Sequence, residues 1–138
     1  MTEGVLLDTS AVIALPRPEE LSLDAPAAIS SITLAELAAG VHGAARPRDR
    51  ASRLVRLQRV EARMVCLPFT PEAARMYGQL YAMVLDGGRQ PRGRRMDLLI
   101  AAVAAIHRIP LVTRNGPDFT DLAPLVKVIA LPALSTTD

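Results

Sequence analysis

The sequence predicts a single α/β domain with a short, mostly parallel central sheet flanked by helices on both faces. Short apolar segments alternate with longer segments of helical periodicity, an order typical of parallel sheets. The chain has 138 residues, half of them hydrophobic, which is enough to bury one core. No repeat or linker divides it, so we expect one domain over residues 1–131 and a tail over residues 132–138.

Five apolar segments are predicted to be strands because each is short, rich in strand-forming residues and followed by polar or turn residues. The second of them carries the weakest pattern. The predicted strands are Val5–Asp8, Ala27–Ser30, Val65–Phe69, Leu111–Thr113 and Val126–Ala130.

Hydroxyl side chains and prolines mark the ends of the predicted helices. Thr9 and Ser10 can cap a short first helix, which Pro16 stops. Thr70 before Pro71 is a typical helix start, with a capping hydroxyl and a proline in the first turn. The expected helices cover residues 11–15, 31 to about 43, 48–63, 71 to about 85, and 97–108.

The composition excludes several classes of protein. No apolar run reaches the ~18 residues that a membrane-spanning helix needs, and the first residues lack the pattern of a signal peptide. The lone Cys66 excludes an internal disulfide and fits a reducing cytoplasm. Aromatic residues are 3% of the chain and tryptophan is absent, so we expect any nucleic acid to be held by its backbone rather than by base stacking.

Four acidic residues stand beside or inside apolar segments, where an isolated carboxylate is costly. Asp8 ends the first predicted strand, and Glu36 lies about two turns into the second helix. Asp97 opens the most apolar helix, and Asp118 follows the strand that ends at Thr113. Ligands of open parallel sheets gather at the carboxyl ends of the strands, and this order of elements can bring all four acids to that edge.

A cluster of carboxylates needs a compensating charge, and hard divalent ions supply it through oxygen ligands. One or two Mg²⁺ or Mn²⁺ ions would suit hydrolysis of a phosphodiester. A zinc site is not expected, because His42 and His107 lack zinc-ligand spacing and cysteine partners.

The basic residues are almost all arginines and fall into two groups. The group from Arg46 to Arg63 is interpreted as the solvated face of a helix. Three residues of the second group, Arg92, Arg94 and Arg95, adjoin Asp97 and are candidate contacts to an RNA backbone, as is Arg114.

Four motifs in order carry a resemblance over nearly the whole chain: Asp8–Ser10, Ser31–Leu37, Asp97–Ala102 and Thr113–Phe119. Together they resemble the PIN domain, and more narrowly the ribonuclease toxins of VapBC-type toxin–antitoxin modules. This resemblance implies an α/β fold with an acidic pocket that binds Mg²⁺ or Mn²⁺.

The resemblance also implies roles for individual residues and partners. Asp8, Glu36, Asp97 and Asp118 would be the metal ligands and catalytic acids. Four further side chains would orient them or a water molecule: Thr9, Ser10, Thr113 and Asn115. The expected activity is endonucleolytic cleavage of RNA by a cytoplasmic toxin that forms a homodimer and is inhibited by a small antitoxin protein.

Two alternatives remain open on the sequence. One is a PIN-like module that binds RNA or a partner protein without turnover, and the other is a solitary RNA-processing nuclease. A phosphoacceptor receiver domain is disfavoured, because no second acid adjoins Asp8 and the segment Met64–Phe69 contains none.

Overall fold

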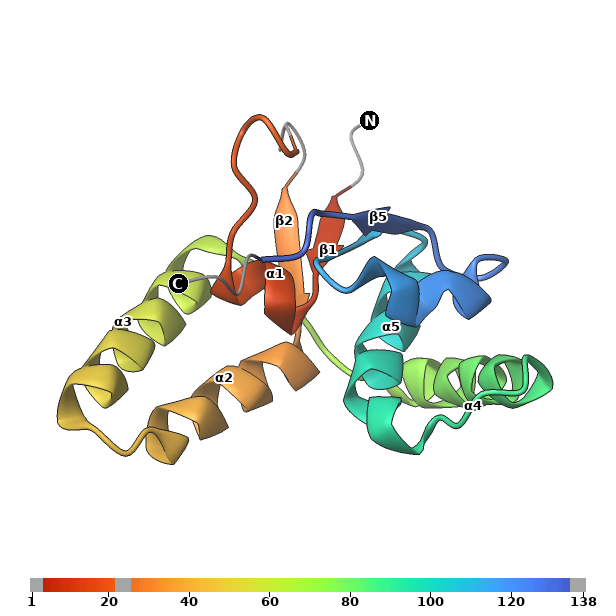
Figure 1. Cartoon of the computed structure of the whole chain (residues 1–138), viewed down its shortest axis with the longest axis horizontal. Coiled ribbons are helices and arrows are strands. Elements are labelled where there is room, and N and C mark those ends of the chain that lie inside the picture. Colours follow the sequence, from red (N-terminus) through yellow and green to blue (C-terminus); the bar gives the residue numbers. More distant parts are fainter. Residues whose placement is uncertain (1–3, 22–25, 135–138) are drawn as a thin grey trace.

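The computed structural model describes residues 4–21 and 26–134 and contains a five-stranded, entirely parallel sheet (Figure 1). The strand order is β3-β2-β1-β4-β5, so β1 lies at the centre of the sheet. The prediction of a parallel α/β fold is therefore confirmed. The strands are β1 (Val5–Leu7), β2 (Ala27–Ser30), β3 (Val65–Leu67), β4 (Leu111–Thr113) and β5 (Val128–Ala130).

Five α-helices and two 3₁₀ helices connect these strands in the described part of the chain. The α-helices are α1 (Thr9–Ile13), α2 (Ser31–Gly43), α3 (Pro47–Arg63), α4 (Pro71–Asp86) and α5 (Arg95–His107). The 3₁₀ helices are η1 (Arg92–Arg94), which precedes α5, and η2 (Gly116–Leu122), which follows β4.

The first helix begins differently from the sequence-based expectation. Thr9 and Ser10 already lie inside α1, and the capping residue is Asp8, whose Oδ1 atom accepts a hydrogen bond from the amide of Ala11 at 3.0 Å. Asp8 is thus an N-cap, a position that carboxylates favour because helix amides there lack partners. The cap fixes this side chain at the end of β1.

Helices cover both faces of the sheet, as predicted, because alternate strand residues point to opposite sides. Leu6 and Leu111 pack in a core cluster with α4 and α5, whereas Leu7, Ile29 and Val112 pack in a second cluster with α1 and α3. Figure 1 shows α2 and α3 on the opposite side of the sheet from α4 and α5. Both cores are apolar, so the polar chemistry is confined to the strand ends.

The sheet grows in one direction from β1 to β3 and in the opposite direction from β4 to β5. β1 leads to β2 and β3 on one side, and β4 and β5 lie on the other, so the carboxyl ends of β1 and β4 flank the switch point. This is where ligands of open α/β sheets bind. The amide of Asp8 donates to the carbonyl of Val112 at 3.0 Å, which extends the pairing of β1 and β4 up to the acid.

Gly116 lets the loop after β4 pack against β5. A Cβ atom at this position would stand 2.6 Å from the Cβ atom of Ala130, far inside van der Waals contact. This close approach places η2, and with it Asp118, beside the end of the sheet.

Within residues 4–21 and 26–134, no helix is long and apolar enough to cross a membrane.

Candidate active site

Asp8 is the most firmly held acid of the candidate site. Its side chain is only 2% exposed. Its Oδ1 atom accepts hydrogen bonds from the amide of Ala11 at 3.0 Å and from the hydroxyl of Ser10 at 2.7 Å, and its Oδ2 atom accepts one from the hydroxyl of Thr113. A carboxylate offers about four lone-pair positions, so this arrangement leaves one on Oδ2 for a cation or water.

Ser10 of α1 and Thr113 of β4 hold Asp8 through their hydroxyl groups. The Ser10 hydroxyl accepts from the amide of Arg114 at 3.0 Å, and the Thr113 hydroxyl accepts from the amide of Asn115 at 3.0 Å. Each hydroxyl therefore accepts a hydrogen bond from a backbone amide and donates one to Asp8. The two hydroxyls fix the orientation of this carboxylate, and their role in catalysis stays a prediction.

Glu36 is held from a different direction. The hydroxyl of Thr9 donates to its Oε1 atom and lies 3.2 Å from the hydroxyl of Thr33. Thr33 and Glu36 are three residues apart on α2 and share one face of that helix. Because Thr9 follows Asp8 directly, this contact ties Glu36 of α2 to the end of β1.

Asp97 and Asp118 complete the group. Asp97 lies in the first turn of α5 and Asp118 in the first turn of η2. Burial raises the pKa of Asp97 to about 6, with further contributions from the charges of Asp8, Asp118 and Glu36 and an opposing one from Arg94. All three other acids thus act on Asp97, as expected if the four carboxylates share one side of the molecule.

The raised pKa of Asp97 predicts how the stability of the metal-free protein depends on pH. The folded value of about 6 exceeds the ordinary value of 3.8, so the folded state is penalised above pH ~6 and the penalty vanishes as pH falls towards ~4. In EDTA, Asp97→Asn should raise the free energy of unfolding by about 1 kcal/mol at pH 8, after allowance for solvent screening, and by almost nothing at pH 4. Urea denaturation at both pH values measures this, and a gain of equal size at both would contradict the assignment.

The donor set of the site suits a hard cation. Its candidate ligating atoms are carboxylate oxygens supported by hydroxyl groups. A divalent ion would offset the repulsion between Asp97 and the charges of the other three acids. Among the described residues, no three His, Cys, Asp or Glu side chains are arranged to hold a metal ion. Which of the four carboxylates would hold an ion therefore stays a prediction.

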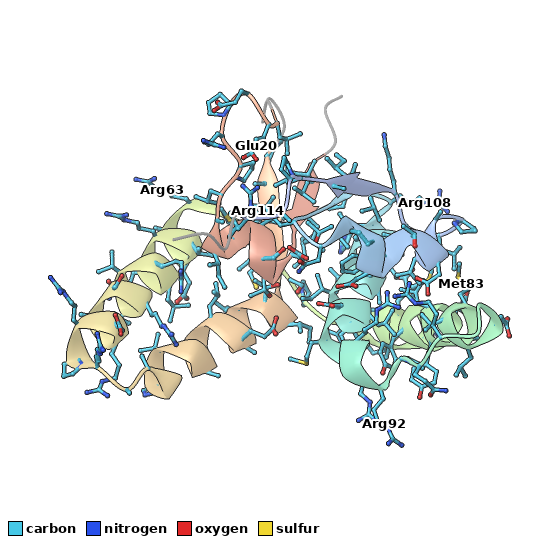
Figure 2. The ribbon with its side chains drawn as sticks, viewed as in Figure 1. Glu20, Arg63, Met83, Arg92, Arg108 and Arg114 are labelled. Atoms are coloured by element: carbon cyan, nitrogen blue, oxygen red, sulfur yellow. The ribbon has the colours of Figure 1, made fainter. Side chains whose placement is uncertain are left out.

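The predicted RNA-contacting arginines near Asp97 differ from one another in exposure. Arg92 and Arg95 are exposed, and Figure 2 shows Arg92 pointing away from the fold. Arg94 is half-buried, and its guanidinium lies 3.4 Å from a carboxylate oxygen of Asp121. Arg92 and Arg95 are free to meet a polyanion, whereas Arg94 is partly engaged, and contact of all three with RNA stays a prediction.

The interpretation of Arg114 as an RNA contact is corrected by the structure. Its side chain is buried, and all five of its N–H groups are used. Two donate to the carboxylate of Glu20, each at 3.1 Å, and the others to the carbonyls of Ala14, Leu15 and Pro132. Figure 2 shows Arg114 and Glu20 beside one another. Arg114 has no donor left for a phosphate and instead binds three chain segments together.

Asn115 contributes through its backbone. Its amide donates to the hydroxyl of Thr113, and its carbonyl accepts from the amide of Asp118 at 3.0 Å. Its side chain is exposed and makes no hydrogen bond within the described residues. A role for that side chain within the acidic cluster stays a prediction.

The sequence-based interpretation missed three residues near the site. Thr33 reads as an ordinary residue of an apolar helix, yet it is fully buried beside Thr9 and Glu36. Arg53 and Arg56 belong to the helix face that was expected to be solvated, but both are half-buried and line a cavity together with Thr9 and Glu36. Their three-residue spacing on α3 was visible, but which way that face points depends on how α3 packs on α2.

The sequence is similar to known families and proteins over most of its length. The PIN domain family matches residues 5–124. Ribonuclease VapC5 of Mycobacterium tuberculosis is 41% identical over 120 residues, which cover 85% of this chain and 86% of that protein. Ribonuclease VapC of Rickettsia bellii is 33% identical over 137 residues, which cover 94% of this chain and 97% of that protein.

Solved structures extend this similarity to the fold. A crystal structure of VapBC-5, a member of the VapBC family of toxin–antitoxin systems from Mycobacterium tuberculosis, matches with a TM-score of 0.79 at 37% identity, over 96% of this chain and 100% of that one. FitAcB from Neisseria gonorrhoeae matches with a TM-score of 0.69 at 28% identity, over 91% of this chain and 96% of that one. The family match, the sequence identities and the shared fold show that the chain belongs to the PIN domain family.

Proposed function

We propose that the chain is a Mg²⁺- or Mn²⁺-dependent endoribonuclease and the toxin of a VapBC-type toxin–antitoxin pair. One observation supports this proposal most directly: Asp8, at the end of β1, is buried and held by Ser10 and Thr113, and its charge, with those of Asp118 and Glu36, adds to the burial that raises the pKa of Asp97. The names of the relatives support the substrate, since VapC5 and the Rickettsia bellii protein are ribonucleases.

In this proposal Asp8, Glu36, Asp97 and Asp118 hold one or two divalent ions. A bound ion supplies Lewis-acid chemistry, which polarises the phosphate and lowers the pKa of a water molecule. Asp8, fixed by its three hydrogen bonds, provides the rigid reference point of the site. Thr9 keeps Glu36 turned towards that point through its own hydrogen bond.

An antitoxin partner is the second part of the proposal. The similar VapBC-5 structure from Mycobacterium tuberculosis belongs to the VapBC family of toxin–antitoxin systems. On this chain, a cavity of about 570 Å³ between α1 and α3 has an apolar floor that includes Val12 and Val60, and Ile13 and Leu15 on its lining are 51% and 54% exposed. Large exposed apolar side chains around a groove are typical of a protein interface. A homodimer stays a prediction.

Metal removal tests the proposed activity. RNA cleavage by the purified chain should fall to background in EDTA and return when Mg²⁺ or Mn²⁺ is added in excess. Cleavage is followed on end-labelled, structured RNAs by gel electrophoresis, with Asp8→Asn prepared in parallel to identify contaminating nucleases. Cleavage that persists in EDTA, or that Asp8→Asn retains in full, would contradict the proposal. Metal-dependent RNA binding without cleavage would favour a binding module.

A further inference from the structure

A cavity of about 550 Å³ runs from the candidate active site into the space between α2 and α3. Thr9 and Glu36 line it at the site end, and Arg53 and Arg56 line it from α3. These four residues come from three different helices, so the cavity exists only because α3 folds back against α2. A nucleic-acid strand bound in this cavity would therefore also lie against Thr9 and Glu36 of the candidate site.

Arg53 is held in place at the cavity wall. One Nη atom donates to the carbonyl of Gly40 at 2.7 Å, which ties the guanidinium to α2. This bond uses one of five donors and leaves the planar group oriented before any ligand arrives. A fixed guanidinium loses little conformational entropy on binding, so it is better suited to holding a phosphate than a free surface arginine.

Arg56 has a donor that lacks a partner. Its Nε atom is buried, and no acceptor lies within hydrogen-bond distance among the described residues. A buried N–H group without an acceptor destabilises the fold, so it calls for an explanation. Arg56 also lines the neighbouring apolar cavity of α1 and α3, so it stands where the two cavities meet.

We propose that Arg53 and Arg56 form a phosphate-binding subsite that holds the RNA backbone next to the scissile phosphate, so that the strand leaves the acidic site between α2 and α3. An RNA strand supplies the anionic acceptor that Arg56 lacks, and a phosphate accepts two parallel N–H groups from a guanidinium. The exposed acid Asp49 also lines the cavity, but its charge is screened by solvent. The subsite rests on the proposed ribonuclease function.

The test compares two double variants that remove the same charge from α3 and its N-cap residue. Arg53→Gln/Arg56→Gln removes the subsite, and Arg46→Gln/Arg48→Gln removes two exposed arginines that line neither cavity. RNA affinity is measured against salt concentration in an Asp97→Asn background to prevent cleavage, and KM and kcat are measured in the otherwise unchanged chain. Arg56→Gln alone is included because Arg56 makes no hydrogen bond in the described structure, so its loss should leave the fold intact.

The subsite double variant should bind RNA at least about tenfold more weakly at 0.1 M salt, with a rise in KM and a smaller change in kcat. The slope of log affinity against log salt should fall by about 0.7 for Arg56→Gln and about 1.4 for the double variant, one phosphate contact per arginine. The control should change both quantities by much less.

Three results would overturn the proposal. Equal losses in the two double variants would mean general attraction rather than a subsite. Unchanged RNA affinity with weakened binding of an acidic antitoxin would assign the cavity to a protein. If the unaltered chain cleaves RNA while the subsite variant keeps its KM and salt slope, the subsite alone is wrong, whereas absence of any RNA cleavage or binding removes the proposed function as well.

Discussion

Asp97→Asn is expected to reduce the kcat of RNA cleavage by at least about 100-fold, because it removes one negative charge from the group that would hold the metal. Asparagine has nearly the same shape and keeps one oxygen acceptor, so packing around the first turn of α5 is preserved. Because it also removes the repulsion exerted on Asp97 by its three acidic neighbours, the variant should fold at least as stably as the unaltered chain. Lost activity would therefore not reflect lost structure.

The measurement is kcat at saturating RNA with Mg²⁺ or Mn²⁺ in excess, accompanied by circular dichroism. Asp86→Asn is the matched control, since Asp86 is an exposed aspartate at the end of α4 and is not among the charges that act on Asp97. The control should retain full activity. An Asp97→Asn enzyme that keeps more than about a tenth of the activity would show that this carboxylate is not required, and the role of the acidic group would have to be reassigned.

The acids of the candidate site could be singled out because a carboxylate next to an apolar run is unusual and is visible in the local sequence. Asp8, Glu36 and Asp97 each stand in such a run, and the order of strands and helices implied a common edge. The parallel pairing of the strands was predicted in the same way, from the alternation of apolar segments and helices. These features depend on short-range patterns together with general rules of topology.

Other features depend on tertiary packing and left no local signal. Glu20 lies in a polar segment rich in prolines and charges, which reads as a solvated loop, although its side chain is 8% exposed. Its partner Arg114 is 94 residues away and resembles any other basic residue near a site for a polyanion. Similarly, half-burial of Arg53 and Arg56 follows from how α3 lies on α2. Long-range pairing of ordinary residues was the information that the sequence alone could not supply.

Arg114→Met is expected to lower the free energy of unfolding strongly, because it removes five hydrogen bonds and leaves the carboxylate of Glu20 without its partner. The pair is bidentate, and the guanidinium also satisfies three backbone carbonyls. The loss is measured as a fall in Tm. Arg17→Met is the matched control: Arg17 approaches the same carboxylate at 3.8 Å but is 73% exposed, so its loss should cost at most about 1 kcal/mol.

The pH dependence of this pair has a defined sign. Hydrogen bonds from Arg114 lower the pKa of Glu20 to about 2, below its ordinary value of 4.5. A depressed folded pKa gives stability that is complete above pH ~4.5 and is lost as pH falls towards ~2. Glu20→Gln should remove this component of acid unfolding, and Arg114→Met/Glu20→Gln should recover part of the stability lost in Arg114→Met, since no unpaired charge remains.

The same arginine also links stability to the site. Its backbone amide donates to the hydroxyl of Ser10, which donates to Asp8, while its side chain fixes the segment after α1 through the carbonyls of Ala14 and Leu15. Arg114→Met should therefore reduce cleavage well below the melting temperature of the variant, and Glu20→Gln should reduce it less. If Arg114→Met unfolds no more readily than Arg17→Met, the buried pair does not hold these segments together, and the hydrogen bonds from Ser10, Thr113 and Ala11 orient Asp8 without it.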